Sequence, residues 1–574
     1  MNKELFIRGL VFVVIVIFIG AIFSPSICSI KLQSNLSVID YSKSNVKENG
    51  IILNNAQTWL WAKGIGGTGD DYGVGVEIDT NGNIYMTGWF NGTALFGDTT
   101  LISQGDWDVY VAKLDSDGIW QWAVRAGGTN YDGGYDIAVD NSGNVYIIGS
   151  YNGTAKFGNT SLTSQGHWDV FIAKLDVNGV WQWAESAGGP SYNNGVGIAL
   201  DTGGNIYITG SFRYPATFGG NPLTNRGYDD IFIAKLDANG VWQWAESAGS
   251  TRGDYGYDVV LDTNDNVIIT GNFYGPAIFG NTSLVSKGEL DVFVAKLDNN
   301  GVWLWAKSAG GRNYDYAYDV ALDNTGNIYI TGNYRDTAWF LIDTLVSQGS
   351  ADVFVAKIDT NGSWQWAKSG GGTGFDNGYG IAMDIDGNIY ITGYFKYTAM
   401  FGSTNLNSQG DADVLISKLN TDGDWLWANS AGGTRNEYGY DIAVDNSKNI
   451  CITGYFNDTV TFGNIPLTSQ GSNDIFIASL SDVNQPPTAP KIEGPSSGEP
   501  GIEYEYTLNS TDPEELPIMY FIDWGDNTSE WTEYCSSGVE ITLKHIWENQ
   551  GTYLIKAKTK DLFDAESEWS EFEV

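Results

Sequence analysis

The segments GYDIAVDNSGNVYIIGSY (residues 134–151) and DVFIAKLDVNGVWQWAESAGG (residues 169–189) decide the fold of most of this chain. The tetrad Trp-x-Trp-Ala in the second segment returns every 61 residues, with no insertion or deletion. Its copies begin at Trp59, Trp120, Trp181, Trp242, Trp303, Trp364 and Trp425. Self-similarity at a fixed period indicates a repeat architecture, which overrides the domain number that length alone suggests.

Each repeat predicts four short strands, which in the second copy are residues 134–140, 145–151, 169–176 and 180–186. Runs of β-branched and aromatic residues bounded by Gly, Asn and Asp are typical of strands and hairpins. No window shows the 3.6-residue period of an amphipathic helix. A long polar stretch, residues 152–168, is expected to connect the second strand to the third.

Repeated four-stranded antiparallel units favour an all-β chain with a β-propeller, in which each sheet is one blade. An open solenoid is the alternative, and the phase of the repeat argues against it. The chain begins with a lone fourth strand near residues 59–62 and ends the repeats with a third strand near residues 474–480. We therefore predict a seven-bladed propeller with four-stranded blades, in which the N-terminal strand closes the last blade and removes the exposed sheet edges.

The two tryptophans of each tetrad share one face of their strand, because residues i and i+2 point the same way. We expect this pair to pack between adjacent blades. A ladder of rings for stacking on carbohydrate is the alternative, but the apolar, strand-like context and the Ala after each pair favour packing.

The two ends of the chain differ from the repeats. A basic lead and an apolar run at residues 10–23 predict a signal peptide over residues 1–29, with an uncleaved membrane anchor as the alternative. Residues 30–56 are polar and are expected to form a flexible leader. The repeats occupy residues 57–484, followed by a Pro-rich linker at 485–490. Residues 491–574 have their own strand pattern and predict an immunoglobulin-like β-sandwich.

The repeated segments quoted above resemble the SBBP family of β-propeller repeats over residues 57–481. That resemblance implies a seven-bladed propeller on an exported or surface protein, with no defined enzymatic activity. YFIDWGD (520–526), His545 and GTYLIKAKTKD (551–561) resemble a PKD domain, which implies a spacer or adhesive module. Together these resemblances imply a secreted or cell-surface location.

The formal charge of −39 argues against nucleic acid or an anionic membrane surface as partners, because phosphate binding needs clustered Lys and Arg. Two His and three Cys leave no zinc site, and no nucleophile elbow or phosphate loop is present. We therefore expect no catalytic residues and no enzyme. A polysaccharide hydrolase or lyase remains the alternative, and it requires an asymmetric acidic pocket.

Acidic residues give two candidate sites. Asp-Gly turns such as residues 79–83 faintly resemble calcium loops, but they also fit hairpin chemistry, in which Asp and Asn side chains bond backbone amides. The second candidate is a column in the loop between the fourth strand and the next first strand. Its acidic members are Asp71, Asp132, Asp254, Asp315, Asp376 and Glu437, and Asn193 occupies the third copy.

If these six acids ring one face of the disc, they form with nearby tyrosines a funnel for cations, a basic peptide or sugars. The alternative is that each acid caps the amides of its own loop. The near-uniform repeats favour a scaffold over a chemical active site. We therefore expect an exported, non-catalytic binding or adhesion protein for a surface protein or a glycan, with no cofactor. A calcium- or carbohydrate-binding, lectin-like module is the alternative.

Overall fold

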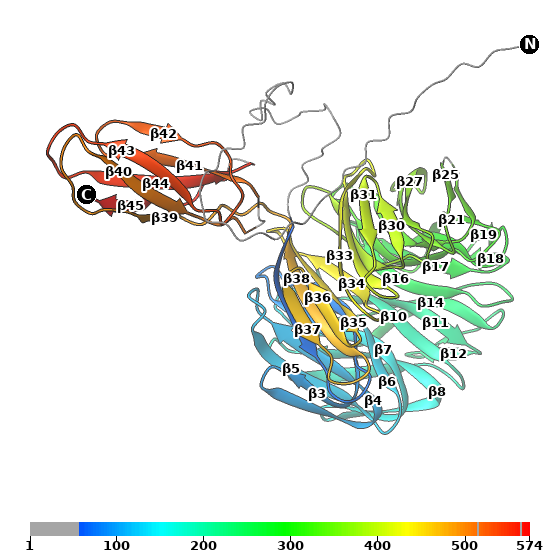
Figure 1. Cartoon of the computed structure of the whole chain (residues 1–574). Helices are drawn as coiled ribbons and strands as arrows, with labels where there is room; N and C mark the ends of the chain where they lie inside the picture. Colours follow the sequence, from blue (N-terminus) through cyan, green and yellow to red (C-terminus); the bar gives the residue numbers. More distant parts are fainter. Residues whose placement is uncertain (1–56, 342, 514–515, 563–564) are drawn as a thin grey trace, which may run out of the picture. The chain divides into compact units, whose positions relative to one another are not determined.

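The computed structural model describes residues 57–341, 343–513, 516–562 and 565–574. The predicted signal peptide (1–29) and leader (30–56) lie outside these residues. The described residues form an all-β structure without helices, as the sequence predicts, and none of them lies in a helix suited to span a membrane. They divide into an N-terminal unit that ends at Asn484 and a C-terminal unit that begins at Gln485 (Figure 1).

The N-terminal unit consists of seven antiparallel repeats of four strands. Repeat 1 contains β2 (Tyr72–Ile78), β3 (Ile84–Phe96), β4 (Thr99–Leu114) and β5 (Trp120–Gly128). Repeat 2 contains β6 (Asp132–Val139), β7 (Val145–Phe157), β8 (Thr160–Leu175) and β9 (Trp181–Ala187). Repeat 3 contains β10 (Asn193–Leu200), β11 (Ile206–Arg213), β14 (Asp229–Leu236) and β15 (Trp242–Ala248).

The remaining repeats follow the same order. Repeat 4 contains β16 (Tyr255–Leu261), β17 (Val267–Phe273), β20 (Asp291–Leu297) and β21 (Trp303–Gly311). Repeat 5 contains β22 (Tyr316–Leu322), β23 (Ile328–Tyr334), β26 (Asp352–Ile358) and β27 (Trp364–Gly372). Repeat 6 contains β28 (Asn377–Met383), β29 (Ile389–Phe395), β32 (Asp413–Leu419) and β33 (Trp425–Gly433). Repeat 7 contains β34 (Tyr438–Val444), β35 (Asn449–Phe456) and β38 (Asp474–Ser481).

The fourth strand of repeat 7 comes from the start of the described chain. β1 (Thr58–Ile65) pairs antiparallel with β38, from Thr58 opposite Ser481 to Ile65 opposite Ile475. This pairing agrees with the phase of the repeat in the sequence. The first strand of repeat 1, β2, packs beside both β6 of repeat 2 and β34 of repeat 7, and residues of all seven first strands line one cavity.

The long connection between the second and third strands is a β-hairpin in every repeat, which corrects the expected polar stretch. In repeats 1 and 2 it is continuous with the flanking strands, where Phe157 pairs with Thr160. In repeats 3 to 7 it consists of β12–β13 (Ala216–Phe218, Asn221–Leu223), β18–β19 (Pro276–Phe279, Thr282–Val285), β24–β25 (Thr337–Phe340, Asp343–Val346), β30–β31 (Thr398–Phe401, Thr404–Asn407) and β36–β37 (Thr459–Phe462, Ile465–Thr468).

The hairpins bind the repeats to one another. In repeats 1 to 6 the end of the fourth strand pairs with the hairpin of the next repeat, as where Gly433 lies opposite Val460. A Cβ atom added to Gly433 would lie 1.8 Å from the carbonyl oxygen of Thr459, so a side chain at this position requires the hairpin to shift. A Gly-Gly pair follows the Trp tetrad in six of the seven copies, and in the copy that begins at Trp242 the second position is Ser250. The first residue of that pair, Gly249, still lies opposite Ile278 of the next hairpin.

The tryptophans pack as expected for a structural role. The ring of Trp181 lies edge-on to Phe157 of its own hairpin, with centroids 5.4 Å apart. Trp183 packs against Gly240 in the turn of the next repeat and belongs to a core cluster shared by repeats 2 and 3. Burial of such large apolar surfaces contributes about 1.5–3 kcal/mol per side chain. The second tryptophan thus covers the seam between repeats.

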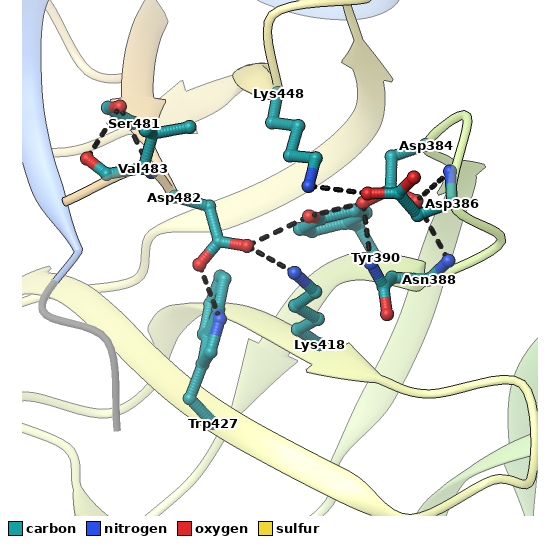
Figure 2. A network of polar contacts seen from close by, with 10 residues as sticks. All are labelled: Asp384, Asp386, Asn388, Tyr390, Lys418, Trp427, Lys448, Ser481, Asp482 and Val483. Atoms are coloured by element: carbon teal, nitrogen blue, oxygen red, sulfur yellow. Dashed lines mark hydrogen bonds and ion pairs between the residues drawn. The ribbon is translucent and has the colours of Figure 1, made fainter. Parts of the chain in front are cut away.

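A buried polar network holds the last third strand where the chain leaves the repeats (Figure 2). Asp482 is buried and accepts hydrogen bonds from Trp427 Nε1 at 2.8 Å and Tyr390 Oη at 2.9 Å. Its carboxylate also pairs with the ammonium of Lys418 at 2.5 Å. In repeats 1, 3 and 5 the corresponding tryptophan donates to a backbone carbonyl, as Trp366 does to Thr421. Asp482 therefore ties repeat 7 to repeat 6 through side chains.

The C-terminal unit contains two sheets around a core of its own. One sheet consists of β39 (Lys491–Glu493), β40 (Glu503–Asn509) and β43 (Ile541–Ile546). The other consists of β42 (Ser529–Trp531), β41 (Ile518–Asp523), β44 (Leu554–Asp561) and β45 (Ser570–Glu573). Thr488, in the predicted linker, is hydrogen-bonded to Thr511 and so lies within this unit.

The histidine of the C-terminal unit has a packing role. The His545 ring stacks on the buried Trp524 with centroids 4.5 Å apart, and its Nε2 lies 2.8 Å from Asp526 Oδ2. Trp547 is also buried and donates from Nε1 to the carbonyl oxygen of Trp524 at 3.2 Å. These contacts join the first two quoted parts of the C-terminal motif, and the ring of Tyr553 in the third part stacks on Trp547 with centroids 5.5 Å apart.

Candidate functional site

Two ends of the repeats carry the candidate residues. We call the end with the fourth-to-first-strand loops and the hairpin bases the loop face, represented by Asp132 and His167. We call the opposite end, with the two tight turns of each repeat, the turn face, represented by Asp140 and Asp176. Figure 1 shows the strands of the seven repeats running between these two ends.

The six predicted acids of the loop face are buried, with at most 1% of each residue exposed. Asp132 accepts hydrogen bonds from the amides of Gly128 at 2.6 Å and Asn152 at 3.2 Å. The same two-amide pattern recurs at Asp71, Asp254, Asp315 and Asp376, and Glu437 accepts from Gly433. The expected acidic ring is therefore not an exposed funnel at Asp71, Asp132, Asp254, Asp315, Asp376 and Glu437, because these side chains are buried and loop amides bond both oxygens of each Asp and Oε2 of Glu437.

Each buried loop acid faces a second buried carboxyl from the third strand of the preceding repeat. Burial, reinforced by the charge of Asp108, raises the pKa of Asp132 to about 7. The other pairs are Asp71 with Asp474, Asp254 with Asp230, Asp315 with Asp291, Asp376 with Asp352 and Glu437 with Asp413. Two carboxyls that share a dry seam favour retention of a proton.

The seam between repeats 2 and 3 has an amide in place of this pair. Asn193 Nδ2 donates to Asp169 Oδ1 at 3.2 Å and to the carbonyl oxygen of Trp168 at 3.0 Å. The corresponding Oδ1 atoms of Asp108, Asp230, Asp291, Asp352 and Asp474 are buried and have no hydrogen-bond partner among the described residues. Asn193 thus shows the place where a proton donor fits in the other seams.

A cavity of about 440 Å³ lies among the seven first strands. Four of its lining residues are aspartates at the same place in the repeat, Asp136, Asp258, Asp319 and Asp441, and the other three repeats have Gly75, Gly197 and Gly380 there. Each aspartate accepts a hydrogen bond from a first-strand amide of the next repeat. The aspartates therefore bridge repeats as well as face the cavity.

The carboxyls of the cavity influence one another. Burial raises the pKa of Asp136 to about 7, and the charge of Asp319 reinforces the rise. The carboxyls of Asp258 and Asp319 share a hydrogen bond. Glu77, which alone replaces a small residue in its column, has its pKa raised to about 8 by burial and by the charge of Asp136. In the sequence this position is either Asp or Gly in every repeat. That pattern predicts a cluster of carboxyls only when the first strands are known to be neighbours.

Aromatic side chains cover the loop face, and their arrangement breaks the repeat symmetry. The rings of Tyr257, Tyr318, Tyr379 and Tyr440 form a chain of contacts with centroids 5.0–5.3 Å apart. Tyr257, Tyr318 and Tyr440 lie where the register of their first strands shifts, and the residues that follow them are the cavity aspartates Asp258, Asp319 and Asp441. At one second-strand position the seven residues are Trp89, Ser150, Ser211, Asn272, Asn333, Tyr394 and Tyr455. The expected uniformity thus fails on this face.

Repeats 1 and 2 contribute an aromatic patch, which we define as Trp89, Trp107, Tyr131, Tyr135 and Trp168. Tyr131 and Trp168 are stacked at 5.2 Å with 16° between their planes, and Trp107 contacts Tyr131 at 5.4 Å. All five side chains are partly exposed. Trp107 and Trp168 occupy equivalent hairpin positions, which the other repeats fill with Asp, Leu, Ala or Asn.

The acidic turns of the turn face have a structural arrangement. Asp140 Oδ1 accepts from the amides of Ser142 and Asn144 at 2.9 Å, and its Oδ2 accepts from Asn144 Nδ2 and Tyr146 Oη. Burial acts to raise the pKa of Asp140, but these hydrogen bonds outweigh it and lower the pKa. Among the described residues, no group of three or more His, Cys, Asp or Glu side chains is placed to hold a metal ion.

Comparison with known proteins gives a partial match for the repeats. The family model SBBP, a β-propeller repeat, matches residues 60–96, 304–333 and 365–394. Each matched segment includes strands of the four-stranded unit described above. These three segments are similar to β-propeller repeats.

Two curated proteins are similar to parts of this chain. The chain is 24% identical to the uncharacterized WD repeat-containing protein L264 of Acanthamoeba polyphaga mimivirus, across 76% of this chain and 38% of that protein. It is 27% identical to the regulatory protein FlaEY of Caulobacter vibrioides, across 28% of this chain and 18% of that protein. The chain therefore matches well under half the length of either relative.

One solved structure is similar to the C-terminal unit. It is the PKD domain of an M14-like peptidase from Thermoplasmatales archaeon SCGC AB-540-F20. The sequences are 42% identical, and the match covers 16% of this chain and 96% of that structure, with a TM-score of 0.16.

Proposed function

We propose that the propeller repeats form a closed, seven-bladed propeller that acts as a non-catalytic binding or adhesion protein. Support for closure comes from the pairing of β1 with β38 and from the position of β2 between β6 and β34. A closed ring leaves no unpaired sheet edge between the first and last repeats. The C-terminal unit is proposed to be a PKD-like sandwich that spaces or supports the propeller.

The observation that carries the proposed binding role is the asymmetry of the loop face. Its buried seam residues are nearly constant, whereas its exposed aromatic and polar residues differ from repeat to repeat. Variation confined to exposed loops on a rigid scaffold is typical of a recognition surface. The apolar start of the chain supports an exported or cell-surface location for that surface.

The aromatic patch favours a carbohydrate-binding, lectin-like mode over a simple scaffold. Its tryptophan and tyrosine rings offer rigid apolar surfaces beside polar edges, and such rings dominate recognition of ligands that have one apolar side. Asp70 and Asp106 lie in the loops that surround Trp107, and Trp107 Nε1 donates to the carbonyl oxygen of Asp70 at 3.2 Å. The rings therefore stand beside hydrogen-bond acceptors.

A glycan array probed with the full chain tests this proposal. We expect binding to at least one glycan, weakened about tenfold by the double substitution Trp107→Ala and Trp168→Ala, because two stacking rings together contribute about 1.4 kcal/mol. Val180→Ala with Val302→Ala is the matched control, because these residues are exposed on the turn face. A complete lack of binding to glycans and to whole cells would contradict the binding role.

A further inference from the structure

Positive side chains gather on the loop face of a chain whose formal charge is −39. Six of the seven arginines in the described residues lie there, in repeats 3 to 7, and the seventh, Arg125, is paired with Asp108 at 2.9 Å. We call this set, with two lysines, the basic arc. It consists of Arg213, Arg226, Arg252, Lys287, Arg312, Arg335, Lys396 and Arg435.

The fold brings residues of the basic arc together at two repeat boundaries. The hairpin base of each repeat contacts the fourth-to-first-strand loop of the next, as where the amide of Tyr228 donates to the carbonyl oxygen of Arg252 at 3.2 Å. Arg226 therefore lies beside Arg252. Gly288, next to Lys287, packs directly on the backbone of Arg312 in the same way. Residues that are 25 or 26 positions apart in the sequence thus become neighbours.

Most arginines of the arc have no carboxylate partner. Arg213 forms a two-pronged pair with Asp229, at 2.9 and 2.8 Å. In the described part of the chain, no salt bridge involves Arg226, Arg252, Arg312, Arg335 or Arg435. The Nε atom of Arg335 is buried without a hydrogen-bond partner among the described residues. A buried, unbonded charged donor is unfavourable unless a ligand satisfies it.

Two acids on these loops are already engaged, whereas the exposed Asp411 lies beside Arg435, to whose carbonyl oxygen its amide donates at 3.1 Å. The carboxylate of Glu289 accepts from the hydroxyl of Tyr274, and Asp336 accepts from Asn313. The seam carboxyls beneath the arc are buried, and burial raises the pKa of Asp230 to about 6 and that of Asp291 to about 7. Exposed positive charge therefore exceeds exposed negative charge along the arc.

Tyrosines accompany the arginines. The guanidinium of Arg213 lies 5.4 Å from the ring centre of Tyr192, and that of Arg252 lies 4.9 Å from Tyr274. Arg335 lies between Tyr314 and Phe375, at 5.8 and 5.1 Å. Tyr228 and Tyr397 are exposed by 69% and 58%. The ring contacts hold the guanidinium planes in place and leave ring surface free for a ligand.

We propose that the basic arc binds an anionic polysaccharide through its carboxylates, an inference that rests on the binding role proposed above. Arginine forks match carboxylates in two-pronged geometry, and exposed tyrosine rings suit the apolar faces of sugars. Nucleic acid fits less well, because its dense phosphate charge meets long-range repulsion from a chain of −39. The arc would guide a polyuronate chain across repeats 3 to 7.

Affinity electrophoresis of the full chain in gels that contain polygalacturonate tests the proposal. We expect retardation that falls as salt is raised, and at least a tenfold loss of apparent affinity in the triple variant Arg252→Gln, Arg312→Gln, Arg435→Gln. The matched control is Lys156→Gln, Lys307→Gln, Lys368→Gln, which removes the same charge from a hairpin and two fourth strands. Thermal unfolding of both variants verifies that they fold.

Other outcomes separate this inference from the proposed function. Equal loss in the arginine and lysine variants, or none in either, overturns the role of the arc. Tighter retardation by single-stranded DNA than by polygalacturonate assigns the arc to nucleic acid and overturns the glycan proposal. Retained binding to neutral glycans through Trp107 and Trp168, with no response to polygalacturonate, removes only the basic arc. Loss of all binding removes the proposed function as well.

Discussion

The turn face and the loop face are built from the same seven repeats and have different degrees of symmetry. On the turn face, Asp79, Asp140, Asp323 and their equivalents use both carboxylate oxygens to close the same turn. On the loop face, only the buried layer is constant, and the exposed residues change from tryptophan to arginine around the repeats. The comparison teaches that backbone geometry fixes the turn face, whereas the loop face has positions that the fold leaves free.

The largest effect is expected where the turn face depends on one unrepeated residue. Asp482→Ala should lower the free energy of unfolding by about 3–5 kcal/mol, because it leaves the ammonium of Lys418 buried without its partner. Chemical denaturation measures this. Asp386→Ala in the same network is the control, since its pair with Lys448 is exposed and should contribute under about 1 kcal/mol. Equal effects would show that the network does not hold repeat 7.

The seams of the loop face should tolerate little change in shape. Gly433→Ala should lower the free energy of unfolding by about 3 kcal/mol, because the added methyl group overlaps the carbonyl oxygen of Thr459 and pushes the hairpin from β33. Gly203→Ala, in a turn-face loop with its nearest contact at 3.2 Å, is the control. A melting temperature of Gly433→Ala close to that of the control would refute the tight seam.

The two faces should respond differently to pH. Burial raises the pKa of Asp376 to about 7, so its contribution to stability is complete below the unfolded pKa and is lost as the pH rises through 7. The difference in free energy of unfolding between Asp376→Asn and the unchanged protein should therefore shift by about 2 kcal/mol in favour of the variant when the pH is raised from 5 to 8. Asp384→Asn on the turn face should show no such drift, because hydrogen bonds lower the pKa of Asp384 despite burial. Parallel curves for both variants would contradict the shared-proton seams.

The smallest effect is expected at a single copy of the repeated turn. Asp140→Ala removes the acceptor for two amides and should lower the free energy of unfolding by about 1 kcal/mol. Substitution at the equivalent Asp201 should have the same effect, and the two should add, because the turns belong to separate repeats. A strongly non-additive double variant would show that the turn face couples neighbouring repeats.

The repeat and its four strands followed directly from the sequence, because the spacing of Trp59 to Trp425 is rigid. The hairpin between the second and third strands was missed, although Phe157 and Leu162 flank a Gly-Asn turn that predicts it. The sequence of this hairpin is polar and rich in threonine, as a loop would be, because one side of the hairpin is exposed.

The site was harder to predict because it depends on neighbours in space. The acids from Asp71 to Glu437 were correctly grouped as one column, but only the fold shows that loop amides occupy them. The basic arc was hidden by a total charge of −39, because a sum over the chain contains no information about which face holds each charge. Arg226 and Arg252 become a pair only when their repeats are adjacent.

The pairing of β1 with β38 has a consequence for biogenesis. Thr58 leaves the ribosome hundreds of residues before its partner Ser481 does. At a synthesis rate of about 5–20 residues per second, roughly 20–80 seconds pass before the partner strand of β1 has been made. During that interval Trp59 and Trp61 have no partner strand, so the sheet of repeat 7 can be completed only after residues 474–481 have been synthesised.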